Sequence, residues 1–276
     1  RRAWIYQEDG TKKILASPSE KIPLDAKLFV DKEEIPEIPL LLVYHKPKYL
    51  LSQMDDDDLN RPHLGMVLSD YHYAQKDVHP VGRLDYDTSG LILFSSNGQL
   101  TQRLLHPNGK TEKEYTAVVQ GIVDPERLER KFKAGVETKE GVHTAQILGI
   151  ESPIAPEEVM QIVQDVQHHG SDHYMEEDKD DEGGILYPTM PYGEDDDDDE
   201  EQEMELCMSR IRLVVTEGKH RMVRRMLANC GHPVWALRRD RIGNISLGDL
   251  PEGCFRDITE DETTWAQGLI STKKKP

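Results

Sequence analysis

The sequence lacks the features that mark membrane-spanning and disulfide-linked proteins. Its longest apolar run, at about residues 40–43, is far shorter than the roughly 20 residues that a membrane-spanning helix requires. Its three cysteines lie far apart, and an odd number of them gives no disulfide framework. We therefore expect a soluble protein with no membrane partner, in a reducing compartment that is either the cytoplasm or the matrix or stroma of an organelle.

The sequence also has no close group of histidine, cysteine and acidic residues with the spacing of a metal site. The acidic run at residues 55–58 offers an alternative, because carboxylates bind cations such as calcium. Consecutive side chains do not all converge on one ion, however, and a solvated loop is the favoured interpretation. The sequence therefore predicts no metal ion.

What the sequence does have is a strong separation of charge. Its net charge is −18. Residues 171–205 hold 17 acidic residues and one basic residue, whereas residues 209–241 hold nine basic residues and two acidic ones. High charge with few apolar residues is typical of disorder, and a basic segment is typical of nucleic-acid binding. We expect an acidic, disordered insertion at residues 151–205, directly before a basic segment.

Helix and strand signals alternate along the rest of the chain. Two helices are marked at both ends, since Asn97 and Asp124 are suitable N-caps and Pro107 and Gly135 follow the last helical positions. Strands are predicted where apolar residues cluster or alternate, over residues 40–47, 90–96, 113–121, 142–151 and 206–218. Links of hairpin length predict an α+β fold, with helices flanking a mixed, mainly antiparallel sheet.

A further helix is predicted over residues 220–230. Its apolar residues recur at spacings of three and four, which defines a core face formed by Val223, Met226, Leu227 and Cys230. Arg221, Arg224 and Arg225 fall on an adjacent face, and such a charged face is usually only solvated. Lys219 and His220 add donors at the helix N-terminus, where backbone N–H groups favour phosphate. This arrangement indicates an RNA backbone as a partner.

The most constrained segment is HPVGRLDYDTSG, residues 79–90. Within it, Asp85 lies two residues after Arg83 and five residues before a glycine. Such an aspartate is usually a turn residue whose carboxylate accepts backbone hydrogen bonds. Asp87, next to Thr88, is likewise typical of a capped turn. The segment alone therefore does not indicate catalysis.

Many motifs together resemble the RsuA-type ribosomal RNA pseudouridine synthases. They follow the family's order and approximate spacing over about residues 40–259, apart from the insertion, and they are KPKYLLSQ, HPVGRLDYDTSGLILFSSNG, LLHP, KEYTAVVQG, EGKHRMVRRML, GHPV, RIG and LGDLPEGCFR. The resemblance implies a pseudouridine synthase catalytic domain at residues 37–262, interrupted at 151–205, and a C-terminal tail at 263–276. Residues 1–36 resemble the second half of the RNA-binding module that precedes this domain in the family.

The resemblance implies that Asp85 is the essential carboxylate in cleaving the N1–C1′ bond of uridine, after which the base rejoins through C5. Whether Asp85 attacks the sugar or the base, or removes a ribose proton, stays open. Arg83 and Lys219 would compensate its charge. Tyr115 would stack on the uracil and Val223 would pack below it, although without the resemblance these two indicate only a strand tyrosine and a core residue. The RNA backbone is expected to contact Lys46, Arg221, Arg224 and Arg225.

The same resemblance implies partners and no cofactor, because isomerising uridine involves no net redox change and no external group. The expected partners are structured ribosomal RNA with a flipped uridine and ribosomal precursor particles, and the chain is expected to be a monomer. Three departures from the family leave open a non-catalytic ribosomal RNA chaperone or assembly factor: Tyr49 in place of a usual glycine, Met222 in place of a common glutamine, and the negative charge of residues 55–58 near the expected RNA entrance. A third hypothesis, compatible with either, is an acidic protein that binds basic ribosomal proteins through residues 171–205.

Overall fold

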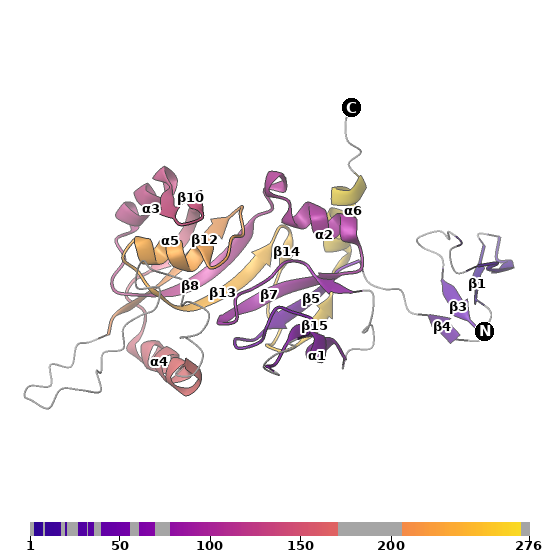
Figure 1. Cartoon of the computed structure of the whole chain (residues 1–276), viewed down its shortest axis with the longest axis horizontal. Coiled ribbons are helices and arrows are strands. Elements are labelled where there is room, and N and C mark those ends of the chain that lie inside the picture. The colour runs from indigo at the N-terminus through magenta and orange to yellow at the C-terminus, as the bar shows by residue number, and fades with distance from the viewer. Residues whose placement is uncertain are drawn as a thin grey trace, which may run out of the picture. The chain divides into compact units, whose positions relative to one another are not determined.

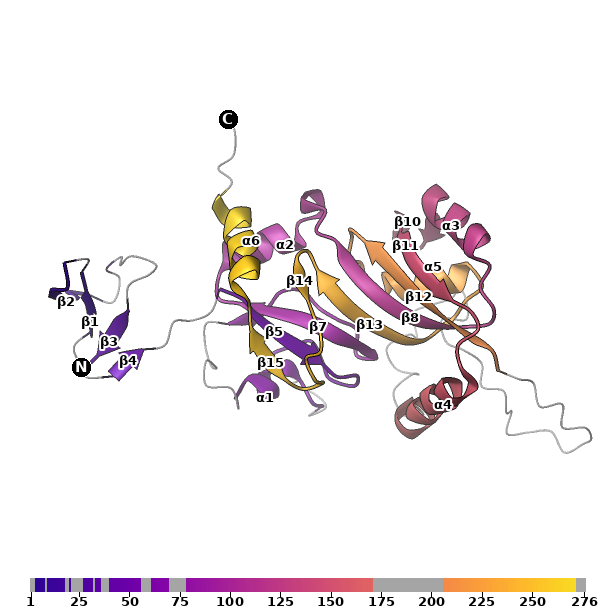
Figure 2. The ribbon, with the colours of Figure 1, turned by 180° about the vertical axis from the view of Figure 1, so that it is seen from behind.

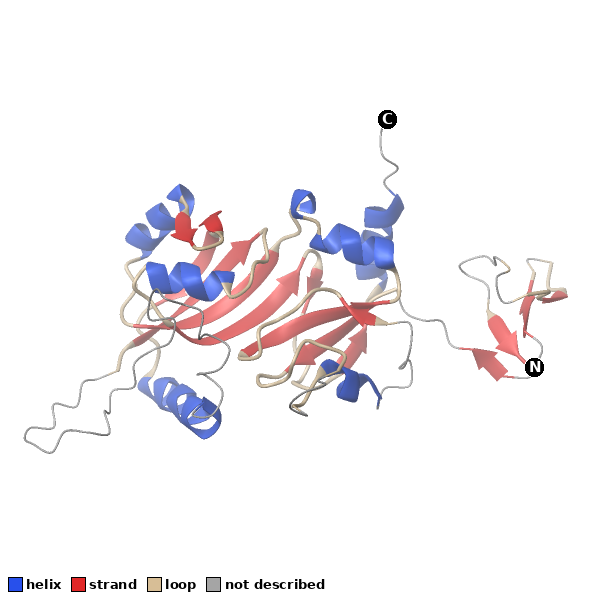
Figure 3. Cartoon of the chain, viewed as in Figure 1, coloured by secondary structure: helices blue, strands red, loops and turns tan. Residues whose placement is uncertain are grey.

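The computed structural model divides the chain into two units, Arg1–Leu40 and Leu41–Pro276, which are described separately. It describes all residues except 1–2, 8, 18–19, 21–26, 32, 36–39, 56–60, 70–77, 171–205 and 272–276. Figure 3 shows the helices and strands of both units. The division between the units falls just after the module-like segment expected at residues 1–36.

The first unit is a small antiparallel sheet with the strand order β2-β1-β3-β4. Its strands are β1 (Ala3–Tyr6), β2 (Lys12–Ile14), β3 (Leu28–Val30) and β4 (Glu33–Ile35). Trp4 stacks on Phe29 with the ring centroids 4.2 Å apart, and Nζ of Lys12 lies 3.7 Å from the centroid of the Trp4 ring. Aromatic packing therefore joins the two central strands of a sheet that has little other core.

The second unit is built on a large mixed sheet with the order β11-β12-β8-β13-β7-β5-β15 (Figures 1 and 2). Its strands are β5 (Leu42–Lys46), β7 (Thr88–Ser95), β8 (Lys113–Gln120), β11 (Gln146–Glu151), β12 (Met208–Val215), β13 (Val234–Ile242) and β15 (Phe255–Asp257). Two short strands, β6 (His79–Pro80) and β14 (Ile245–Ser246), pair with β7 and β13. Among the strand pairs of this sheet that the structure describes, β13 and β7 alone are parallel, which confirms the mixed, mainly antiparallel sheet.

The parallel contact between β7 and β13 explains a glycine of the 79–90 motif. Gly90 lies on β7 beside Arg239 of β13. A Cβ atom on Gly90 would lie 2.4 Å from the backbone oxygen of Arg239 and 2.5 Å from its nitrogen, and the φ angle of Gly90 is 109°. Because any side chain would collide with backbone there, only glycine allows the two strands to approach.

Helices α3 (Pro125–Ala134) and α5 (Met222–Asn229) cover one face of the sheet. Their side chains share a core with Ala117 and Val119 of β8. The predicted N-caps are confirmed, since Asp124 accepts a hydrogen bond from Arg127 N, and Asn97 accepts two at the start of α2 (Gly98–Leu105). The second unit also contains the short elements α1 (Leu64–Ser69), η1 (Pro107–Gly109), β9 (Val136–Thr138) and β10 (Gly141–His143).

The opposite face of the sheet carries α4 (Pro156–Gly170), which the sequence analysis did not anticipate. Ile154 and Val159 are buried against Val118, whose neighbours on β8 face the other core. The expectation of a disordered insertion is therefore wrong for residues 151–170, where apolar residues at spacings of three and four form a helix on the sheet. The rest of that insertion, residues 171–205, lies outside the described residues.

A second correction concerns the expected tail at residues 263–276. Helix α6 (Glu260–Ser271) lies against α2 at one end of the sheet in both Figure 1 and Figure 2. Ala266 is fully buried, and Glu262 forms a two-bond ion pair with Arg256 at 2.8 and 2.9 Å. Residues 263–271 therefore belong to the second unit. Among the described residues, every helix is too short or too polar to cross a bilayer.

Candidate active site

A cavity of about 460 Å³ lies on the face of the sheet that α5 covers. It is formed by the loop before β7, by β8 and β13, by the end of α2 and by the start of α5. Five residues that the sequence analysis proposed for catalysis or base binding line it together: Arg83, Asp85, Tyr115, Lys219 and Val223. Segments that are far apart in the sequence thus converge on one site.

The burial of these side chains differs along the cavity. Tyr115 and Val223 are buried, Asp85 is half-buried, and Arg83 and Lys219 are exposed. The aromatic ring and the apolar side chain therefore form the inner wall, whereas the two cations lie where a large solute can reach them. A flat, partly apolar ligand with an anionic backbone matches this distribution.

The loop that carries Asp85 is held by hydrogen bonds to its backbone. Ser52 Oγ donates to Leu84 O at 2.7 Å and accepts from Leu84 N at 3.0 Å. It therefore holds both backbone polar groups of the residue that precedes Asp85. Asp85 O accepts from Thr88 N at 3.1 Å, which closes the turn into β7. A carboxylate on a loop that is fixed in this way loses little conformational freedom when a ligand binds.

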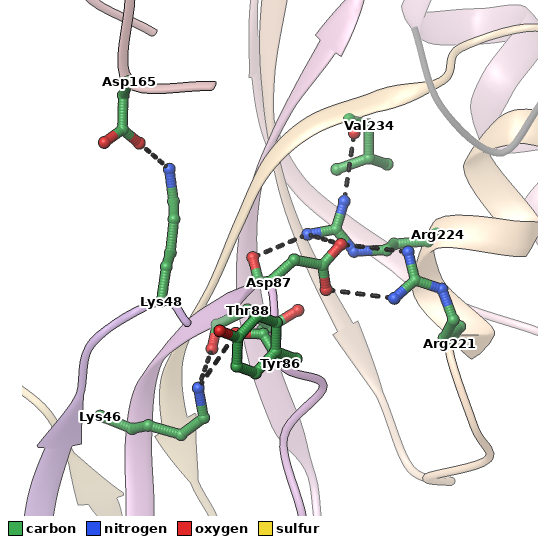
Figure 4. Close-up of polar contacts among 9 residues, drawn as sticks. All are labelled: Lys46, Lys48, Tyr86, Asp87, Thr88, Asp165, Arg221, Arg224 and Val234. Atoms are coloured by element: carbon green, nitrogen blue, oxygen red, sulfur yellow. Dashed lines mark hydrogen bonds and ion pairs between the residues drawn. The ribbon is translucent and has the colours of Figure 1, made fainter. Parts of the chain in front are cut away.

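Lys46 lies beneath this loop and is fully buried (Figure 4). Its Nζ donates to the carbonyl oxygens of Pro47 at 2.8 Å and Thr88 at 2.9 Å, with Tyr86 O at 3.4 Å. Burial lowers the pKa of Lys46 to about 7, although Asp87 and Asp85 act in the opposite direction. The expectation that Lys46 contacts the RNA backbone is corrected, because its side chain crosslinks the loop that carries Asp85 from inside the protein.

Asp87 joins the loop to α5 through two arginines (Figure 4). Arg221 donates to both carboxylate oxygens of Asp87 at 3.1 and 3.0 Å. Arg224 lies 3.2 Å from the carboxylate and donates to the backbone oxygens of Asp87 and Val234. Burial acts to raise the pKa of Asp87, but Arg224 and Arg221 outweigh it and hold the pKa below its ordinary value.

These contacts correct the prediction for the arginine face of α5. Arg221, Arg224 and Arg225 are 2%, 2% and 6% exposed, so their guanidinium groups are not on a surface that RNA can reach. Arg225 instead donates to His220 O at 2.9 Å and lies 3.5 Å from Glu140. Helical spacing did not reveal that Arg221 and Arg224 are turned toward the buried carboxylate of Asp87.

Tyr49, which replaces a glycine that is usual in the family that the sequence resembles, has a backbone conformation that favours glycine. Its φ angle is 61°, in the left-handed region. The N–H of Tyr49 donates to Tyr86 O at 2.7 Å, and the two rings meet at 64° with centroids 5.7 Å apart. This departure from the family pattern therefore adds an aromatic contact next to Asp85 and leaves the loop in place.

Two cavity residues were missed by the sequence analysis. Lys113 and Arg239 line the cavity, and both are buried, at 9% and 3% exposure. Lys113 could have been found, because it lies two residues before Tyr115 on a strand and so shares its face. Arg239 had no comparable signal, since its position opposite Tyr115 depends on the pairing of β8 with β13.

The structure also bears on metal binding. Within the described ranges, no group of three or more histidine, cysteine, aspartate or glutamate side chains has an arrangement that could hold a metal ion. Residues 56–58 lie outside those ranges, so the structure does not test the acidic run at residues 55–58.

Comparison with known proteins gives consistent matches. Residues 40–229 match a family model described as RNA pseudouridylate synthase. A Mycobacterium leprae protein named as an uncharacterized RNA pseudouridine synthase is 31% identical over 80% of this chain and 66% of its own length. Ribosomal large subunit pseudouridine synthase B of Bacillus subtilis is 27% identical over 95% of this chain and 83% of its own. The chain thus spans just under two thirds of the length of the mycobacterial relative.

The fold has a counterpart among solved structures. A crystal structure of a pseudouridylate synthase superposes with a TM-score of 0.53 at 22% sequence identity, and the match covers 97% of this chain and 88% of the other. At this level of identity the likeness concerns the fold alone. It agrees with the sheet and helix arrangement described above.

Proposed function

Because the chain belongs to the RNA pseudouridylate synthase family, we propose that it isomerises uridine to pseudouridine in ribosomal RNA. The observation that carries this proposal is the cavity in which the half-buried carboxylate of Asp85 and the buried ring of Tyr115 occur together. The Bacillus subtilis relative is named for the large ribosomal subunit, which supports ribosomal RNA as the substrate.

The reaction exchanges one bond for another and needs no group from outside. The N1–C1′ bond breaks and a C5–C1′ bond forms, while C5 loses a proton and N1 gains one. Asp85 is the carboxylate that begins this exchange, by attack on the sugar or the base or by removing a ribose proton. Arg83 and Lys219, exposed on the same cavity, would compensate its charge and bind the phosphates that flank the uridine.

Tyr115 and Val223 form the surface on which the base would lie. A base in a helical stack cannot enter a cavity of this kind, so the target uridine must be flipped out, and Tyr115 replaces the stacking that it loses. The chain is proposed to act as a monomer. The proposed site of action is the ribosomal precursor particle, in which assembly has not yet made the RNA inaccessible.

The substitution Asp85→Asn tests this function, because it keeps the shape of the side chain and removes its charge. We expect conversion of uridine in unmodified ribosomal RNA, mapped site by site, to fall by several orders of magnitude, with each tenfold loss equal to about 1.4 kcal/mol. RNA affinity should change little. Asp249→Asn, at an exposed position outside the cavity, is the matched control and should retain full conversion.

The rival function, a ribosomal RNA chaperone without catalysis, makes the opposite prediction. It requires that the wild-type protein bind ribosomal RNA and yield no pseudouridine at any site. Substantial turnover by Asp85→Asn would instead show that the protein is an enzyme with a different essential group. The same mapping experiment therefore separates all three outcomes.

A further inference from the structure

Two buried cations flank Tyr115, and the proposed mechanism has not used them. Lys113 lies two residues before Tyr115 on β8, and Arg239 is paired with Tyr115 across the sheet on β13. Both line the cavity. The Nη1 of Arg239 lies 3.4 Å from the Tyr115 hydroxyl oxygen, and its Nε donates to Leu91 O at 2.8 Å.

Within the described part of the chain, neither cation forms an ion pair with a carboxylate. Among the described residues, the one hydrogen bond of the Lys113 ammonium is to Thr111 O at 3.3 Å. The Nη2 of Arg239 is buried and has no hydrogen-bond partner within the same part of the chain. Burying a positive charge that no carboxylate compensates is costly even where neutral groups accept hydrogen bonds from it. A pair of such charges beside a cavity therefore calls for an electron-rich ligand in that cavity.

The close environment of Lys113 agrees with this conclusion. Burial and, after it, the charge of Arg239 lower the pKa of Lys113 to about 8. A Cβ atom on Gly218 would lie 3.7 Å from Cε and 3.9 Å from Nζ of Lys113, so the lysine extends along the cavity wall toward the segment before α5. The other charged or titratable side chains that line the cavity are Arg83, Asp85, Glu217, Lys219 and His220.

We propose that Lys113 and Arg239 stabilise the negative charge that the uracil base acquires during isomerisation. This inference rests on the proposed function and deepens it. When the N1–C1′ bond breaks, its electron pair stays on N1 and is delocalised onto the ring oxygens O2 and O4. If a carboxylate adds to C6 instead, the electrons of the C5–C6 bond move to O4. Every route left open for Asp85 therefore places charge on the oxygens of a base stacked on Tyr115.

The geometry gives the two cations a role that Arg83 and Lys219 do not have. Both of the latter are exposed, where water weakens electrostatic interactions. Lys113 and Arg239 lie in the wall beside the base platform, and donors that are fixed in a water-poor site stabilise developing charge most effectively. Because a guanidinium only donates hydrogen bonds, Arg239 also directs the Tyr115 hydroxyl hydrogen toward other acceptors.

The decisive variant is Lys113→Met, which keeps the length of the side chain and removes the charge. On transcribed, unmodified large-subunit ribosomal RNA, the single-turnover rate of conversion should fall about 100-fold or more. The dissociation constant for the same RNA should stay within about threefold, because the charge on the base develops only during the reaction. Lys113→Arg should restore most of the rate. Lys133→Met, on the exposed face of α3, is the matched control.

The pH dependence of the rate provides a readout that a purely structural role would not change. The wild-type rate should decline as the pH rises above about 8, because the Lys113 ammonium loses its proton there. Lys113→Arg keeps its charge and should lack this decline, while the other charged groups of the cavity are the same in both proteins. This comparison remains available even if Lys113→Met folds poorly.

Three results would overturn the inference. Wild-type turnover with an unchanged rate in Lys113→Met would do so while leaving the proposed function intact. An identical alkaline decline in wild type and Lys113→Arg would assign the titration to another group. Absence of pseudouridine with the wild-type protein would remove the proposed function itself, and the inference with it.

Discussion

At the scale of single residues, buried ion pairs of Asp87 hold the loop that carries Asp85 against α5. One carboxylate fixes two guanidinium groups that belong to a different element, and its backbone is two residues from Asp85. A buried ion pair is a weak source of net stability, but removing one partner leaves the other charges without compensation. The loop is therefore sensitive to changes at Asp87 that leave Asp85 untouched.

We expect Asp87→Asn to lower the free energy of unfolding by about 3–5 kcal/mol, measured by urea denaturation at pH 7. The effect should depend on pH. Because the folded state lowers the pKa of Asp87, its contribution is complete above the unfolded pKa of about 3.9 and is lost as the pH falls through the folded pKa. The difference between wild type and variant should thus shrink below about pH 4. A constant difference down to pH 2 would contradict this assignment.

The residue scale also shows what sequence can and cannot establish about a site. The family motifs brought Asp85, Arg83 and Tyr115 forward, and all three line one cavity. Helical spacing misplaced Arg221, Arg224 and Arg225 on the surface, because a spacing of three or four residues reports a shared face and not what the face contacts. Arg239 was missed because its neighbour Tyr115 is reached only through strand pairing.

At the scale of elements, α4 is the feature that most changes the expected architecture. Two ion pairs connect it to the rest of the unit: Glu158 pairs with Arg210 of β12, which also pairs with Glu151 of β11, and Asp165 pairs with Lys48. Figure 4 shows the pair between Asp165 and Lys48, which is two residues after Lys46 in the sequence. Exposed ion pairs contribute about 1 kcal/mol or less, so the apolar contacts of Val159 and its neighbours are expected to hold the helix in place.

Two adjacent positions on α4 allow a matched test of this expectation. Val159 is 7% exposed and Met160 is 59% exposed. Val159→Asp should lower the free energy of unfolding by about 3 kcal/mol or more, because it buries a charge without a partner. Met160→Asp should change it by less than about 0.5 kcal/mol. Thermal and urea unfolding of both variants would measure this, and equal small effects would show that α4 is not firmly docked.

The sequence predicted elements best where their ends carry specific residues. Asn97 and Asp124 mark helix starts through side chains that accept backbone hydrogen bonds, and both predictions were confirmed. The sequence does not mark the start of α4 at Pro156 as clearly, because the acidic residues that follow the helix dominate the composition of this segment. Its apolar stripe, which includes Val159, Ile162 and Val166, has the helical spacing that would have revealed it.

At the scale of the whole molecule, local patterns did not determine which strands are neighbours. The parallel pairing of β13 with β7 and the edge position of β15 join segments that are more than a hundred residues apart in sequence. Such contacts depend on the packing of the entire sheet and leave no periodic signal. The sequence therefore predicted a mixed, mainly antiparallel sheet but not the order of its strands.

Charge is the property of the whole molecule that most directly affects RNA binding. The chain carries a net charge of −18, and residues 171–203 hold 16 acidic residues and one lysine. Without that segment the net charge would be −3. The basic surface is smaller than the sequence indicated, because four arginines of the basic segment are buried: Arg221, Arg224, Arg225 and Arg239. In the proposed function, exposed cations such as Arg83 and Lys219 therefore attract RNA although the net negative charge of the protein repels its phosphates.

We therefore expect deletion of residues 171–203 to tighten binding to unrelated RNA while conversion of the true substrate stays nearly unchanged. The difference in affinity should be largest at low salt and should shrink as salt is raised, because screening limits such repulsion to about 8 Å at physiological ionic strength. A second variant, with every aspartate and glutamate of the segment replaced by its amide, keeps the length of the chain and should behave like the deletion. If the amide variant instead binds RNA like the wild type while the deletion binds more tightly, the segment acts by occupying space. Equal affinities of all three proteins at low salt would identify it as an insertion without influence on RNA binding.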